Sequence, residues 1–144
     1  GAGLNVFIAQ FIKMGEYSEI HALKRFSDLI TIEQYGRGRF IKGKPSPEDI
    51  EAAGRGLERI KNIIDLRDHH VIILEEANVA VTCGLFSVED LLKIIDKKPD
   101  DVEIVITGRD ARPEIIERAD LVTEMKEIKH YYQKGVKARV GIEK

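Results

Sequence analysis

The apolar residues of this 144-residue chain fall into short runs that alternate with segments of helical spacing. Runs of this length, bounded by polar residues and glycines, predict about five β-strands. The predicted strands are residues 6–12, 29–35, 71–74, 102–107 and 121–125. The run Val71–Leu74 is apolar at every position, which is typical of a strand buried on both faces in a parallel sheet.

Helical patterns lie between these runs. Ser46, Pro47 and Asp49 form a capping pattern, and apolar residues then recur at spacings of three and four along one helix face. This face consists of Ile50, Ala53, Leu57, Ile60 and Ile64. Further helices are predicted around Ile20–Phe26, after the cap Ser87 with Asp90, and from Pro113. Alternating strands and helices predict one α/β domain over residues 1–144, with a mainly parallel sheet and helices on both faces.

Composition and charge narrow the class of protein. The chain is 43% hydrophobic and 33% charged, with a net charge of -2. A negative balance argues against non-specific nucleic-acid binding, which depends on cationic charge. No apolar run approaches the roughly 20 residues of a membrane helix, and the N-terminus lacks signal-peptide features. The single cysteine, Cys83, excludes an internal disulfide, so we expect a cytoplasmic protein with no nucleic-acid or membrane partner.

Polar side chains follow the predicted strands at their carboxyl ends. They are Gln10 and Lys13, then Glu75, Glu76 and Asn78, then Thr107 and Arg109, and finally Glu124, Lys129 and His130. Parallel strands end at one edge of their sheet, and ligands bind outside that edge. Carboxylates there suit a divalent cation, and lysine and arginine suit phosphates. The sequence therefore predicts a metal–nucleotide site.

Each of these groups also has an interpretation that needs no ligand. Glu75 and Glu76 could begin a solvated helix, and Arg109 could lie in a surface turn. The basic loop 36–44 could be a solvated linker, Lys13 a surface lysine, and His130 a structural histidine. Their expected place on one edge favours the site, because independent accidents need not share an edge.

Short motifs occupy these strand ends in a fixed order. They are QFIK at 10–13, ILEEAN at 73–78, ITGR at 106–109, and a tail comprising ADLVTEM at 119–125, KH at 129–130, Gly135, KA at 137–138 and GIE at 141–143. This ordered set resembles the ATP:corrinoid adenosyltransferases of the bacterial P-loop type, whose corresponding segments include LDE-x-N and TGR. The resemblance runs from Gly3 to Glu143, and the tail is its most specific part.

The resemblance implies transfer of the 5′-deoxyadenosyl group from ATP to Co(I) of a corrinoid, with release of triphosphate, in adenosylcobalamin biosynthesis or salvage. Cobalt is then the nucleophile, and Mg²⁺ (or Mn²⁺) neutralises the leaving group. On this interpretation Glu75 and Glu76 hold the metal, and Glu76 and Arg109 are catalytic. The residues expected to contact substrates are Gln10, Lys13, Phe40, Asn78, Thr107, Lys129 and His130. The implied partners are ATP, cob(I)alamin or cobyrinic acid diamide, a flavoprotein reductant, and a second copy in a homodimer.

Two departures from the family pattern bear on activity. The GKGKT-like phosphate loop is absent from these residues, and the resemblance places it before Gly1. We therefore expect a P-loop NTPase (RecA-like) core that lacks its first strand, loop and helix, with weakened triphosphate binding. Glu75 stands where the family has Asp, which makes Glu76 the safer metal ligand. The chain has no Trp, so Phe40 with Ile41 is the nearest counterpart of the family's aromatic lid.

Two other functions fit part of the sequence. Without a phosphate loop, the chain could be a non-enzymatic module that binds a nucleotide or a corrinoid. The acid pair alone also suits a P-loop ATPase or kinase relative, in which such residues serve phosphoryl transfer.

Overall fold

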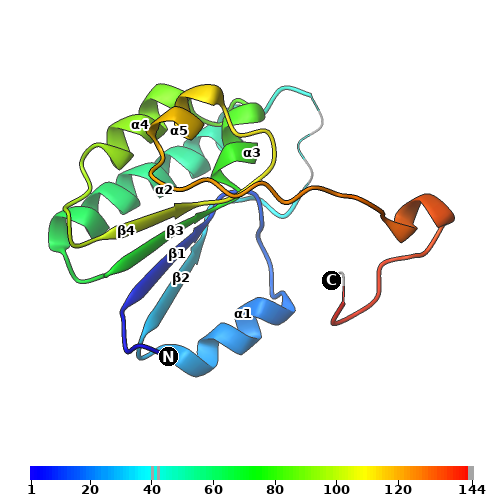
Figure 1. Ribbon diagram of the computed structural model, residues 1–144, viewed down its shortest axis with the longest axis horizontal. Helices are drawn as coiled ribbons and strands as arrows, with labels where there is room; N and C mark the ends of the chain where they lie inside the picture. The colour runs from blue at the N-terminus through cyan, green and yellow to red at the C-terminus, as the bar shows by residue number, and fades with distance from the viewer. Residues whose placement is uncertain (40, 42, 143–144) are drawn as a thin grey trace.

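The computed structural model describes residues 1–39, 41 and 43–142 and contains a four-stranded, fully parallel sheet (Figure 1). Its strands are β1 (Val6–Gln10), β2 (Ile30–Gln34), β3 (Val71–Glu75) and β4 (Glu103–Ile106), in the order β2-β1-β3-β4. The register places Gln10 between Gln34 and Glu75, so the three strands end level with one another. The predicted parallel α/β sheet is confirmed.

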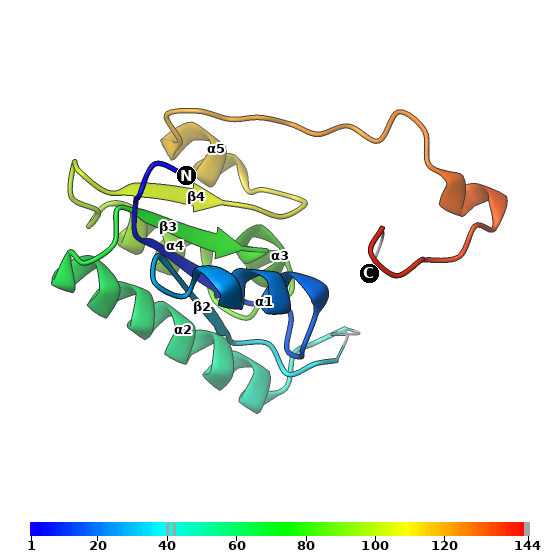
Figure 2. The ribbon, with the colours of Figure 1, turned by 90° about the horizontal axis from the view of Figure 1, so that it is seen from below.

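Helices cover the two faces of this sheet unequally. The α-helices are α1 (Ser18–Leu23), α2 (Pro47–Leu66), α3 (Ala77–Thr82), α4 (Val88–Ile95) and α5 (Pro113–Arg118). Figures 1 and 2 show α1 on one face and α2, α4 and α5 on the other, which confirms helices on both faces. Within the described residues, no helix combines the length and apolar character needed to cross a membrane.

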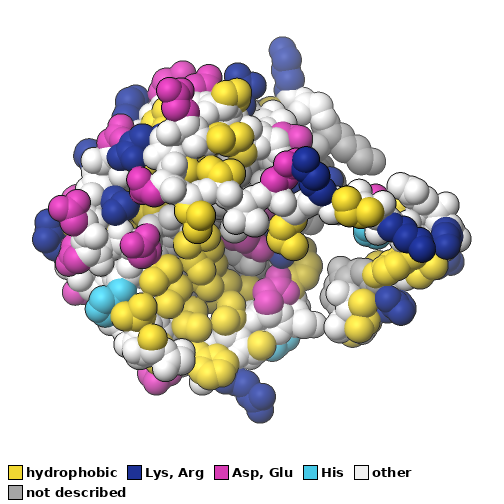
Figure 3. Space-filling view, viewed as in Figure 1, with side chains coloured by type: hydrophobic (Ala, Val, Ile, Leu, Met, Phe, Trp, Pro, Cys, Tyr) yellow, Lys and Arg dark blue, Asp and Glu magenta, His cyan; other side chains and the backbone are white. Residues whose placement is uncertain are grey.

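The main core lies between the sheet and the three helices on its more covered face. Phe7, Ile72 and Leu74 are fully buried there, in one cluster with residues of α2, α4 and α5. Val71 and Ile73 point to the opposite face and are half-buried, because α1 covers only part of it. Apolar side chains gather on that open face (Figure 3). The expectation that β3 is buried on both faces therefore holds for one face only.

The long helix α2 begins as its sequence predicts. The Ser46 side chain accepts a hydrogen bond from the Asp49 N–H, and the Asp49 carboxylate accepts one from the Ser46 N–H. Of the predicted apolar face, Ala53, Leu57, Ile60 and Ile64 are buried. Ile50 was placed wrongly, since it is 45% exposed. The first turn of α2 faces a polar loop instead of the core, because Arg39 in that loop pairs with Asp49 at 2.6 Å.

The predicted fifth strand, residues 121–125, is wrong, because these residues are not in a strand. No described strand pairs with them, and Leu121 and Met125 are 86% and 94% exposed. The segment leaves the body of the protein as an extended arm that ends in a short 3₁₀ turn, Tyr131–Lys134 (Figure 2). The composition of this segment favours a strand. A strand forms, however, only where a neighbouring strand can complete its hydrogen bonds.

Replacing Ser46 with Ala should lower the free energy of unfolding by about 1 kcal/mol, because the N-cap hydroxyl is lost. The loss would be measured by urea denaturation, with Ser46→Thr expected to retain most of the stability. Ser87→Ala is the matched comparison, since Ser87 and Asp90 form the same capping box on α4. Unchanged stability in Ser46→Ala would show that the box at α2 contributes nothing.

Candidate functional site

The strand ends bring most of the predicted site residues to one edge of the sheet. Glu75 ends β3 beside Gln10 of β1, and the Thr107 N–H after β4 donates to the Leu74 carbonyl at 3.2 Å. The edge thus collects Gln10, Lys13, Glu75, Glu76, Asn78 and Thr107. The geometric part of the prediction, a shared carboxyl edge, is confirmed for these residues.

Lys13 links this edge to α1. Its Nζ donates to Glu75 Oε1 at 3.0 Å and to Glu19 Oε1 at 3.2 Å. Partial burial acts to lower the pKa of Lys13, but the hydrogen bonds to Glu75 and Glu19 outweigh it and leave the pKa above its ordinary value. Lys13 is therefore a charged bridge, and its immediate partners are carboxylates.

Glu75 and Glu76 have different surroundings although they are adjacent. Glu75 Oε2 is buried and has no hydrogen-bond partner among the described residues, while Oε1 is bound to Lys13. Glu76 adopts a left-handed backbone with φ 57° and ψ 23°. Burial, followed by repulsion from Glu75, raises the pKa of Glu76, and the charges of Lys13 and Arg109 oppose that rise. Glu75 thus has one oxygen, Oε2, without a partner among the described residues. The neighbouring carboxylate of Glu76 ionises less readily than an ordinary glutamate.

Asn78 and Thr107 connect the loops that follow β3 and β4. The Asn78 side-chain Nδ2 donates to the Gly108 carbonyl at 3.3 Å, and Thr107 Oγ1 accepts from the Glu76 N–H at 3.1 Å. Asn78 is 6% exposed, and its Oδ1 is buried without a partner among the described residues. Asn78 Oδ1 is thus a second buried oxygen without a partner among the described residues, after Glu75 Oε2.

Gln10 is packed into the sheet and is not open to a ligand. It is 2% exposed, and its Oε1 accepts from Gln34 Nε2 at 2.8 Å. The loops after β1 and β2 approach closely beside it, because a Cβ on Gly36 would lie 2.1 Å from the Ile12 carbonyl oxygen. This close approach requires glycine at position 36.

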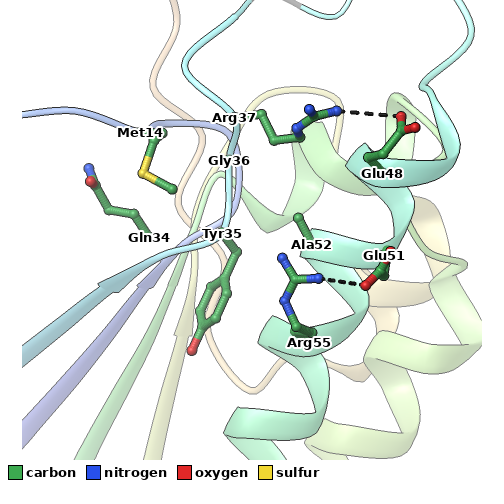
Figure 4. Close-up of a pocket in the computed structure, with 9 residues that line it drawn as sticks. All are labelled: Met14, Gln34, Tyr35, Gly36, Arg37, Glu48, Glu51, Ala52 and Arg55. Carbon is green, nitrogen blue, oxygen red and sulfur yellow. Dashed lines mark hydrogen bonds and ion pairs between the residues drawn. The ribbon is translucent and has the colours of Figure 1, made fainter.

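A groove opens beside these loops, between the end of β2 and the first half of α2 (Figure 4). Its volume is about 530 Å³. It is lined by Met14, Gln34, Tyr35, Gly36, Arg37, Glu48, Glu51, Ala52 and Arg55. Arg55 pairs with Glu51 at 2.9 Å and Arg37 with Glu48 at 3.5 Å. Each arginine of the groove thus faces an acid of α2, so the positive and negative charges of its wall are paired.

Several predicted site residues lie apart from the carboxylates. Arg109 is exposed, although its charge is near enough to affect the pKa of Glu76. Lys129 and His130 lie in the exposed C-terminal arm, where His130 Nδ1 accepts from the Tyr132 N–H at 3.0 Å. Phe40 lies outside the described residues. Within the described ranges, the structure shows no hydrogen bond or ion pair from Arg109, Lys129 or His130 to the acid pair, and the roles of all four residues stay predictions.

Two features of the site were not predicted from the sequence. The second partner of Lys13 is Glu19, in the first turn of α1, and its acidic character was the available signal. The left-handed conformation of Glu76 had no signal, because such conformations favour Gly, Asn or Asp. It places a glutamate where the chain turns sharply from β3 into α3.

The oxygens at the end of β3 fit a magnesium ion. Mg²⁺ is commonly held by one or two carboxylates, with waters and substrate phosphates as its other ligands. Glu75 and Glu76 supply the carboxylates, and Glu75 Oε2 is an acceptor that the protein leaves unpartnered among the described residues. No group of three or more His, Cys, Asp and Glu side chains suited to a metal occurs in the described ranges. A Mg²⁺ ion held by these two carboxylates would take its other ligands from water and substrate phosphates.

Comparison with known proteins identifies the family of this chain. Residues 1–143 match the family model described as ATP:corrinoid adenosyltransferase BtuR/CobO/CobP. A corrinoid adenosyltransferase of Sinorhizobium sp is 32% identical over 98% of this chain and 67% of its own length. One from Pseudomonas aeruginosa is 31% identical over 99% of this chain and 71% of its own length. A corrinoid adenosyltransferase of Escherichia coli K12 is 32% identical over 51% of this chain. This chain therefore belongs to the ATP:corrinoid adenosyltransferase family.

Proposed function

We propose that the protein transfers the 5′-deoxyadenosyl group of ATP to the Co(I) centre of a corrinoid. The Co–C bond forms with the electron pair of cobalt, the C5′–O bond breaks, and triphosphate leaves with the bonding electrons. The observation that carries this proposal is the Lys13, Glu75 and Glu76 cluster at the sheet edge of a family member. The cluster offers two carboxylates for a metal and one cation, Lys13. It offers no nucleophile, and this displacement needs none from the protein because cobalt attacks.

Glu75 and Glu76 would hold Mg²⁺ (or Mn²⁺), and Asn78 Oδ1 is a further unpartnered oxygen nearby. When bound, the metal would neutralise charge on the triphosphate. The two carboxylates repel each other, which contributes to the raised pKa of Glu76, and a bound cation would favour their joint ionisation. Lys13 orients Glu75 through its 3.0 Å ion pair.

Arg109 is the cation best placed to meet the substrate. It is exposed, it follows Thr107 and Gly108 at the same edge, and its charge acts on Glu76. An arginine can donate two parallel hydrogen bonds to a phosphate. We assign it to the triphosphate, whereas Lys13 has its contacts with Glu19 and Glu75. No side chain is needed as general base, because cobalt is the nucleophile.

The remaining features of the proposal concern surroundings and partners. ATP and cob(I)alamin or cobyrinic acid diamide would be the substrates, and a flavoprotein would reduce the cobalt. A cytoplasmic location suits a chain with one cysteine, and a homodimer would be the working form. The 144 residues contain no GKGKT-like run, so strong triphosphate binding would need a further anion-binding segment.

For the proposed function, the first prediction concerns the reaction itself. The protein expressed from its complete gene, mixed with ATP, Mg²⁺ and chemically reduced cobalamin, should form a light-sensitive Co–C product and release triphosphate. Absence of that product under anaerobic conditions would refute the proposal. Steady release of phosphate without corrinoid would indicate an ATPase instead. Calorimetric binding of ATP or hydroxocobalamin without turnover would indicate a binding module.

The second prediction separates chemistry from folding at Glu76. The folded protein holds the Glu76 proton more tightly than the unfolded chain, so ionised Glu76 opposes folding above its pKa. In metal-free buffer, Glu76→Gln should be at least as stable as the wild type at neutral pH. That advantage should vanish as the pH falls below 4.5, the ordinary value for the carboxyl pKa. Thermal unfolding against pH measures this effect.

The same variant should lose magnesium-dependent activity by on the order of 100-fold, since it loses a ligand of the metal that would neutralise the leaving triphosphate. Glu117→Gln, which changes an exposed acid of α5, is the matched control and should retain activity. A Glu76→Gln protein that loses stability in step with activity would show that Glu76 is structural.

A further inference from the structure

The loops after β3 and β4 are joined by Thr107, which uses both of its oxygens. Its hydroxyl oxygen accepts from the Glu76 N–H at 3.1 Å, and its carbonyl accepts from the Asn78 N–H at 3.2 Å. Its own N–H donates to the Leu74 carbonyl at 3.2 Å. Thr107 therefore contacts the chain before, at and after the corner that carries Glu76.

Glu76 has a backbone conformation that a glutamate rarely adopts. Its φ of 57° and ψ of 23° lie in the left-handed region, where Cβ crowds the following carbonyl. Such residues persist only where neighbouring contacts over-determine them, and they concentrate at functional sites. Glu76 stands at the N-cap of α3 without a side-chain capping bond, so its side chain does not stabilise the corner. The bond from its N–H to Thr107 does.

The close approach of the two loops depends on a second feature, Gly108. Its φ is +121°, and a Cβ there would lie 3.2 Å from Asn78 Cβ and from Val79. The Asn78 side chain then donates to the Gly108 carbonyl at 3.3 Å. Glycine thus allows the contact between the loops, and Asn78 and Thr107 fix it by hydrogen bonds.

We propose that Thr107 is a positioning residue: its hydroxyl fixes the left-handed backbone of Glu76 and so orients the Glu76 carboxylate at the sheet edge. The effect of Thr107 on Mg²⁺-dependent activity rests on the proposed function, whereas its effect on the Glu76 backbone does not. This assignment rests on a contact within the protein, since the Thr107 hydroxyl oxygen accepts from the Glu76 N–H.

The test compares three variants of the complete protein by NMR in metal-free buffer. Thr107→Val removes the hydroxyl and keeps the shape, whereas Thr107→Ser keeps the hydroxyl. Thr82→Val is the matched control, since the Thr82 hydroxyl bonds to the Asn78 carbonyl at 3.1 Å and not to Glu76. Amide exchange and the Cα and Cβ shifts of Glu76 report its hydrogen bond and its φ.

Thr107→Val should speed exchange of the Glu76 amide by about tenfold or more and shift its Cα and Cβ signals. Thr107→Ser and Thr82→Val should resemble the wild type. The Asn78 amide should keep its protection in every variant, because its acceptor is the backbone carbonyl of residue 107. If Thr107→Val fails to fold, Thr107→Ala serves in its place, with the same expected result.

Measuring activity against Mg²⁺ concentration tests whether the position of Glu76 matters for the proposed reaction. The Mg²⁺ concentration for half-maximal activity should rise at least several-fold in Thr107→Val and return in Thr107→Ser. An unchanged Glu76 amide in Thr107→Val, or a Thr107→Ser protein that behaves like Thr107→Val, would overturn the positioning role. If the amide changes as expected but even the wild type forms no Co–C product, the proposed function fails and the positioning role stands.

Discussion

Parallel pairing of β3 with both β1 and β4 is the constraint on which the rest of the structure depends. It aligns Gln10 with Glu75 and brings Thr107 within hydrogen-bonding distance of the residue after Glu75. Helices α2, α4 and α5 cover one face and supply the core that makes this pairing stable. The candidate site contains little apolar packing of its own. Its geometry derives from the strands beneath it.

Charge balance at this edge explains why acids and a lysine coexist there. Lys13 lies between Glu19 and Glu75, so one cation is shared by two acids. Glu76 has no such partner among the described residues, and its pKa rises through burial and through the charge of Glu75. The edge therefore carries surplus negative charge at the end of β3. A divalent cation arriving with a nucleotide would balance it.

Some elements of this fold follow from local sequence patterns, and others depend on contacts between distant residues. The two capping boxes and the strands β1 to β4 follow from local spacing, and the structure confirms them. Residues 121–125 also have strand-favouring composition but form no strand, because pairing depends on a neighbour that local spacing cannot report. At the site, the shared edge followed from parallel topology. The left-handed backbone of Glu76 did not, since it results from a contact with a residue 31 positions away.

The glycine at position 36 affects which positions a loss-of-function screen would identify as essential. Any side chain there would overlap the Ile12 carbonyl oxygen, so the loops after β1 and β2 can approach this closely only with glycine at position 36. A genetic screen for loss of function would therefore recover Gly36 beside the acids, although glycine offers no group to metal or substrate. A position at this edge can therefore be intolerant to substitution for a steric reason as well as for a chemical one. Different experiments are needed to tell the two reasons apart.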